Sequence, residues 1–240
     1  MERFSSPEAA CRSLALEIAA LVREKPDARL GLPTGRTPIP LYRELARLHR
    51  EEGLSFARAC SFNLDEYLGL AADDARSFRA FMREHFFAQV DFEPRNVHFP
   101  NVAGEPEREA RAYAQELRAA GGLDLALLGL GRNGHVGFNE PGSGRDSSAR
   151  VVELADQTRA DAAVAFGGLA NVPVRAITLG LAEILEARAI RMLAFGAAKS
   201  EVVRRMLLEP ASQACPASLL RGHADLALLL DEGASTGLPR

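Results

Sequence analysis

The sequence is poor in cysteine and has no long hydrophobic run, and each shortage excludes a class of protein. It contains three cysteines, far apart and mostly on predicted apolar faces: Cys11, Cys60 and Cys215. We therefore expect reduced core thiols in a cytoplasmic protein, with neither disulfides nor a cysteine metal set. No apolar run approaches the about 20 residues needed to cross a membrane. The first residues, MERFSSPEAACRS, lack the apolar core of a signal peptide, so we expect no membrane partner.

A strong charge of one sign is also missing. The net charge is −3, which provides no basic surface of the kind that binds nucleic acid, although a local basic site could still hold a small anion. The five histidines are scattered, and neither H-x-x-x-H nor C-x-x-C occurs. We therefore predict no metal site.

What the sequence does contain is a regular alternation of predicted strands and helices. The 240 residues, 47% of them hydrophobic, suffice for a sizeable core. Apolar runs predict strands at residues 28–32, 57–63, 97–99, 125–129, 150–154, 176–179, 189–195 and 224–230. Helical spacing predicts helices at residues 7–25, 41–48, 77–90, 105–120, 157–166, 182–186 and 196–208. We predict a single α/β domain over residues 1–240, with a mainly parallel sheet and a polar tail from Asp231.

The stretch LALLGLGRNGHVGFNEP, residues 125–141, is the centre of the functional prediction. Its apolar run indicates a strand covered on both faces, and the following glycines allow a sharp turn close to a ligand. Ligands of open α/β sheets bind beyond the carboxyl ends of the strands, which is where Asn133, His135 and Glu140 are expected. A histidine can move protons near neutral pH, and Glu140 could orient it. A plain turn histidine bonded to the backbone is the alternative.

Residues 129–134 also match the G-x-G-x-x-G pattern of dinucleotide-binding proteins. That pattern must open a helix directly, whereas Gly137 and Pro141 follow at once without helical periodicity. We therefore do not predict a bound nucleotide.

A second turn, GLPTGRTP at residues 31–38, lies between a predicted strand and a predicted helix. An anion could bind here to the helix N-terminal amides together with Gly35, Arg36 and Thr37. The spacing of the glycines differs from that of a nucleotide-binding P-loop. A sugar phosphate is favoured, and a plain connection is the alternative. Lys199 falls in the first turn of a predicted helix, where the helix dipole disfavours a cation, so we expect it to hold an anion.

Asp65 and Glu66 are adjacent carboxylates at the end of the strand predicted at residues 57–63. Their position makes both of them catalytic candidates. The alternative is an acidic turn or a helix cap.

Three segments together resemble the glucosamine-6-phosphate deaminases: GLPTGRTP, FNLDEY at residues 62–67, and GLGRNGHVGFNEP at residues 129–141. The similarity extends over nearly the whole chain, and the last segment is the most specific. The resemblance implies a three-layer α/β/α sandwich with a modified Rossmann-like sheet. It also implies conversion of an aminosugar phosphate to fructose 6-phosphate and ammonia without a cofactor.

Under this resemblance, Asp65 would shuttle a proton between C2 and C1 of the sugar. His135, supported by Glu140, would catalyse ring opening. Asn133 occupies a position that is often aspartate in the family. Because asparagine does not titrate, it could only form hydrogen bonds and orient His135.

The same resemblance assigns the phosphate to Gly35, Arg36, Thr37 and Lys199. The family usually has a further phosphate-binding arginine in a segment that corresponds to residues 162–166, which contain none. Of the effector-binding set, Ser143 and Arg150 are present, but Val152 stands where allosteric members often have lysine. We therefore expect weak or absent allosteric activation. The resemblance leaves a homo-oligomer open.

Other functions stay open at this point. One is a related enzyme, either a 6-phosphogluconolactonase or a galactosamine-6-phosphate deaminase/isomerase. A lactonase needs only water activation by His135, so Asp65 would matter less. Another is a non-enzymatic sugar-phosphate sensor, which the fold alone does not exclude. The joint presence of Asp65, His135 and Glu140 argues against a sensor.

Overall fold

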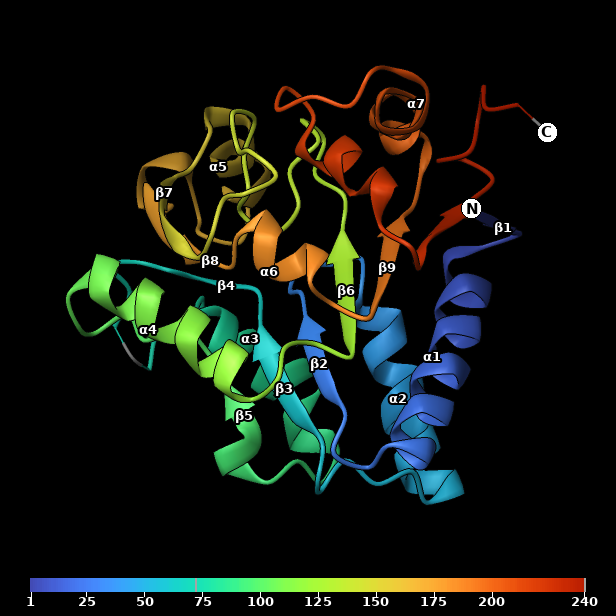
Figure 1. Cartoon of the computed structure of the whole chain (residues 1–240), viewed down its shortest axis with the longest axis vertical. Helices are drawn as coiled ribbons and strands as arrows, with labels where there is room; N and C mark the ends of the chain where they lie inside the picture. The colour runs from blue at the N-terminus through green and yellow to red at the C-terminus, as the bar shows by residue number, and fades with distance from the viewer. Residues whose placement is uncertain (72, 240) are drawn as a thin grey trace.

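The computed structural model describes residues 1–71 and 73–239, and its centre is a seven-stranded parallel sheet (Figure 1). The strand order is β1-β10-β9-β6-β2-β3-β5, and all neighbouring pairs are parallel. The strands are β1 (Glu2–Phe4), β2 (Arg29–Leu32), β3 (Cys60–Asn63), β5 (Val97–His98), β6 (Leu125–Gly129), β9 (Ala189–Ala194) and β10 (Leu226–Asp231). The inner strands are short apolar runs because both faces of the sheet are covered.

Helices cover the two faces. One face packs against α1 (Pro7–Glu24), α2 (Ile39–Glu52) and α3 (Phe78–His85), and the other against α4 (Pro106–Ala119), α6 (Leu181–Leu185) and α7 (Ser200–Leu208). Alternate residues of β6 join the two cores, Leu127 on the side of α1 and Leu128 on the side of α4, as the two-residue period of a strand requires. The predicted α/β/α sandwich with a mainly parallel sheet is confirmed.

Local signals define the helix ends. Ser6 Oγ accepts a hydrogen bond from Ala9 N at 3.1 Å, and Pro7 occupies the first position of α1. Such a cap contributes about 1 kcal/mol. The helix α2 ends at Gly53, whose φ of 68° favours glycine. Short 3-10 helices are η1 (Phe87–Gln89), η2 (Pro94–Asn96), η3 (Leu169–Asn171), η4 (Ala197–Lys199) and η5 (Pro216–Gly222).

A second, antiparallel sheet contains β4 (Asp65–Tyr67), β8 (Arg175–Thr178) and β7 (Arg150–Glu153) in that order, and α5 (Asp156–Ala162) follows β7. The strands predicted near residues 150 and 176 are confirmed. The alternative of an acidic turn directly after β3 is wrong, because residues 65–67 pair with β8. A three-residue strand is too short for its periodicity to appear in the sequence.

Three further differences concern the ends of the chain and Lys199. The strand β1 was not predicted. Lys199 ends η4 and immediately precedes α7, so it does not lie within the first turn of an α-helix. The segment from Asp231 was expected to be a polar tail, yet Ala234 and Leu238 are buried; its last residue, Arg240, lies outside the described residues.

The cysteines are free, Cys11 and Cys215 buried and Cys60 half-buried. Burial raises the pKa of Cys11 to about 12, which keeps this thiol protonated. No helix in the described part of the chain is long and apolar enough to cross a membrane. A single domain over the whole chain stays a prediction.

Candidate active site

The candidate residues gather at the carboxyl edge of the parallel sheet. The strands β2, β6 and β9 are neighbours, so the connections that follow them lie next to one another. These connections hold Arg36, His135 and Lys199. We call residues 129–141, after β6, the histidine turn.

Two glycines allow the histidine turn to fold around its own side chain. The amide of Gly131 donates to the carbonyl of His135 at 2.9 Å, and a methyl group at Gly131 would overlap the imidazole of His135. Gly137 has φ 55°, and a methyl group there would lie 3.3 Å from Asp65 Oδ2. Glycine is therefore required where the histidine folds back and where Asp65 approaches the turn.

His135, Glu140 and Asn133 form one hydrogen-bonded group. His135 Nδ1 lies 3.4 Å from Glu140 Oε2, and Asn133 Nδ2 donates to the same oxygen at 2.8 Å. Asn133 Oδ1 accepts from the amide of His135 at 3.1 Å. The asparagine thus holds both neighbours, which agrees with an orienting role.

Burial by itself would raise the pKa of Glu140, but contacts with His135, Thr158 and Asn133 outweigh it and lower the pKa below its ordinary value. Glu140 is therefore an anion at neutral pH. An anion beside Nδ1 favours the tautomer that carries its proton there. That tautomer leaves Nε2 for a ligand.

Thr158 of α5 also belongs to this group, although no sequence pattern marks it as a site residue. Its hydroxyl lies 3.3 Å from His135 Nδ1, and the amide of Ala155 donates to Glu140 Oε1 at 3.3 Å. A threonine in a weakly periodic helix gives no signal in the sequence. Only its burial in the fold marks it.

The structure separates the two adjacent carboxylates. Glu66 accepts hydrogen bonds from the amides of Tyr67, Phe78 and Arg79, each at 2.9 Å, and so caps α3. The alternative of a helix cap is therefore correct for Glu66. Asp65 is 5% exposed, and its carboxylate makes no hydrogen bond to the described residues. Burial, with the nearby charge of Glu66, raises the pKa of Asp65 to about 8.

The predicted phosphate residues lie on both sides of the histidine turn. Gly35 has φ 93° and open space around it, and Arg36 is exposed just before α2. Lys199 Nζ donates to the carbonyl of Leu130 at 2.6 Å. Burial lowers the pKa of Lys199. In the segment without arginine, Val164 is 82% exposed and provides no polar group.

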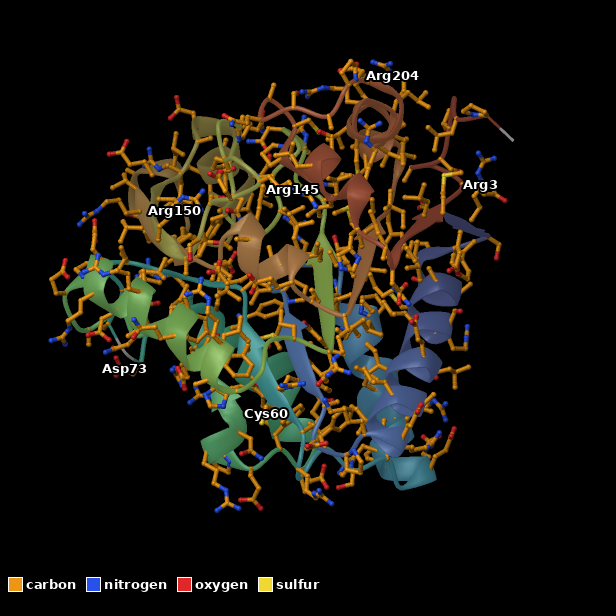
Figure 2. The ribbon with its side chains drawn as sticks, in the orientation of Figure 1. Arg3, Cys60, Asp73, Arg145, Arg150 and Arg204 are labelled. Carbon is orange, nitrogen blue, oxygen red and sulfur yellow. The ribbon has the colours of Figure 1, made fainter. Side chains whose placement is uncertain are left out.

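Arg150, one of the two predicted effector residues, lies in β7 of the small sheet (Figure 2). It contacts Ser143, the other predicted effector residue. Arg150 Nη2 donates to Ser143 Oγ at 2.7 Å, and Nη1 donates to Asn139 Oδ1 at 2.9 Å. Asn139 belongs to the histidine turn and donates in turn to the carbonyl of Leu179 at 2.8 Å. Arg150 is therefore connected to the turn that carries His135.

The chain is similar to known proteins over almost its whole length. Residues 4–228 match the family described as glucosamine-6-phosphate isomerases/6-phosphogluconolactonase. Glucosamine-6-phosphate deaminase 1 of Giardia intestinalis is 49% identical over 220 residues, which cover 91% of this chain and 83% of that protein. A solved structure described as a monomeric glucosamine-6-phosphate deaminase is 41% identical, has a TM-score of 0.95 and is matched over 98% of both chains. The 6-phosphogluconolactonase from Trypanosoma brucei is 25% identical with a TM-score of 0.79, covering 99% of this chain and 98% of that one.

Proposed function

The chain belongs to the family of glucosamine-6-phosphate isomerases and 6-phosphogluconolactonases, and we propose that it converts glucosamine 6-phosphate and water to fructose 6-phosphate and ammonia. Sequence identity to a named deaminase is 49%, against 25% to the lactonase. The relatives' similarity therefore favours the deaminase over the lactonase.

The observation that carries the proposed chemistry is the state of Asp65. Moving a proton from C2 to C1 of an open-chain sugar needs one group that takes the proton and returns it. Asp65 is buried, faces the histidine turn at Gly137, and has a pKa of about 8. A carboxylate with a pKa near the working pH is an effective base and an effective acid. An ammonium group on C2 of the substrate would favour its charged form.

Ring opening is assigned to His135. Breaking the bond between C1 and the ring oxygen requires a proton on that oxygen, and a proton must leave the hydroxyl on C1. Glu140 lies against Nδ1 of the imidazole, and Asn133 holds both Glu140 and the backbone amide of His135. Nε2 can therefore carry a proton to the ring oxygen. After the C2 to C1 transfer, water adds to the resulting C2 imine and ammonia leaves, which yields the ketose.

The phosphate is assigned to Gly35, Arg36, Thr37 and Lys199. The loop before α2 offers amides and a hydroxyl, and the half-buried ammonium of Lys199 adds positive charge. A phosphate would give that ammonium a charged partner in addition to the carbonyl of Leu130.

We propose weak or absent allosteric activation. Arg150 and Ser143 can form part of an anion site, but Val152 on the same strand adds no charge. The buried free thiols suit the reducing cytoplasm, where we place the reaction. A homo-oligomer stays a prediction; one solved deaminase relative is described as monomeric.

The deciding experiment measures ammonia and fructose 6-phosphate from purified protein with glucosamine 6-phosphate. Galactosamine 6-phosphate and 6-phosphogluconolactone are assayed in parallel. We expect equimolar products from the glucosamine ester and a loss of about a hundredfold or more in Asp65→Asn, because general acid–base catalysis is worth that much. Rapid lactone hydrolysis that survives Asp65→Asn would instead identify a lactonase. Preference for the galactosamine ester would correct the epimer.

A further inference from the structure

Arg132 is a cation of the histidine turn that the proposed mechanism does not use. It lies three residues before His135, and its side chain is 54% exposed. Its guanidinium Nη1 lies 3.2 Å from Asp161 Oδ1, on α5. Asp161 also accepts a hydrogen bond from Gln157 Nε2 at 2.9 Å, so its carboxylate is shared.

The neighbouring cation is Lys199. Its ammonium donates to the carbonyl of Leu130, two residues before Arg132, so Lys199 of η4 is anchored to the turn that carries Arg132. The two cations also act on each other: after burial, the charge of Arg132 contributes to lowering the pKa of Lys199, whereas Asp161 opposes it. Asp161 pairs with Arg132 and its charge also acts on Lys199. These three groups together therefore carry a net positive charge.

We propose that Arg132 is a phosphate-binding residue, and that Asp161 is the counter-ion that a sugar phosphate displaces. The inference deepens the proposed function and rests on it for the identity of the sugar. A phosphate monoester carries a charge of about −1.5 to −2 at pH 7, which matches two cations. A guanidinium can bind two phosphate oxygens at once, and this geometry is unavailable to lysine.

A purely structural role is the competing explanation. In it, the Arg132–Asp161 pair would only hold α5 against the histidine turn. Exposed ion pairs contribute little to stability, and Thr158 and Ala155 already make this connection through Glu140 and His135. The two explanations predict opposite relations between the variants Arg132→Gln and Asp161→Asn.

The test measures KM and kcat for the amino sugar phosphate, and the affinity for inorganic phosphate by calorimetry. In Arg132→Gln we expect KM to rise, and phosphate affinity to fall, by about tenfold or more, since a charge-assisted hydrogen bond is worth that factor. We expect kcat to change by less than about threefold, because Arg132 is assigned to the phosphate and to none of the reacting atoms. Asp161→Asn should tighten phosphate binding and lower KM, because the competing carboxylate is gone.

A matched control is Arg23→Gln. Arg23 pairs with Glu52 at 3.6 Å, and the two side chains are 50% and 42% exposed, close to the values of the pair under test. This pair joins the ends of α1 and α2, and α1 ends just before β2 begins, on the amino side of the sheet. Its loss should leave both KM and phosphate affinity unchanged.

Phosphate affinity unchanged in Arg132→Gln would overturn the proposal. Weaker phosphate binding in both Arg132→Gln and Asp161→Asn would also overturn it and support the structural role. Calorimetry with phosphate needs no turnover. The two proposals can therefore fail separately. If the wild type releases no ammonia, and phosphate binds the wild type but not Arg132→Gln, the proposed function is refuted and the anion site is retained.

Discussion

Replacing Asp65 by asparagine should abolish ammonia release and at the same time make the protein more stable at neutral pH. The reason is the cost of ionising a carboxyl group in a site that is 5% exposed. Burial and then the charge of Glu66 raise the pKa of Asp65 from 3.8 to about 8. Asparagine has a similar shape and resembles the protonated acid, so it avoids that cost.

The sign and size follow from proton linkage. Between pH 4 and pH 8 the unfolded chain has lost the Asp65 proton while the folded protein keeps it, so the free energy of unfolding falls as pH rises. The slope is about 1.4 kcal/mol per pH unit. At pH 7 the accumulated loss relative to low pH is about 4 kcal/mol, and above pH 8 it becomes constant because both states are ionised. Asp65→Asn lacks this loss.

The assay is urea unfolding of wild type and Asp65→Asn at pH 5, 6, 7 and 8, with ammonia release measured on the same samples. Between pH 5 and pH 7, the difference in unfolding free energy between the variant and the wild type should grow by about 3 kcal/mol. This is about 1.4 kcal/mol for each pH unit. For the wild type, kcat/KM should rise toward pH 8 as free Asp65 ionises. An advantage that stays constant from pH 5 to pH 8 would refute the raised pKa.

Two further substitutions test the packing of the site and of the sheet. Gly131→Ala should lower kcat by about tenfold or more, because the new methyl group displaces the ring of His135 and a small misplacement of a catalytic group slows the reaction strongly. An unchanged kcat in a folded variant would contradict the close packing of His135 against Gly131. Asp124→Asn should lower the unfolding free energy by about 3 kcal/mol at pH 7, because it leaves Arg29 and Lys25 without their buried partner. Burial alone would raise the pKa of Asp124, but these partners lower it to about 2, so the wild type loses this stability as pH falls from about 4 toward 2. Unfolding curves should show the difference shrinking by about 1 kcal/mol between pH 5 and pH 3, and a constant difference would argue against the ion pairs.

The strands of the parallel sheet other than β1 could be predicted, and the clearest of them are local apolar runs. Residues 125–129 form β6, and residues 189–195 contain β9. The sheet to which a strand belongs could not be predicted in the same way. Residues 150–154 have the same strand pattern, yet β7 pairs antiparallel with β8 in the small sheet, because its partners come from other parts of the chain.

The candidate site shows the same division. The motifs identified His135, Glu140 and Asn133 as neighbours because they lie within eight residues. Position at a strand end made both Asp65 and Glu66 candidates, and only the resemblance to the deaminases assigned the proton transfer to Asp65. The physical distinction between the two depends on α3, whose first amides bind Glu66 and leave the carboxylate of Asp65 without a partner in the described chain.

The sequence by itself determined the α-helices, the parallel strands other than β1 and the two turns at the carboxyl edge, since capping, periodicity and glycine placement act between near neighbours. The tertiary structure alone decided that Thr158 reaches His135, that Lys199 binds the carbonyl of Leu130, and that Arg132 faces Asp161. Each of these contacts joins segments far apart in the chain. Their geometry depends on the strand order and on burial, and burial also raises the pKa of Asp65 and lowers that of Lys199.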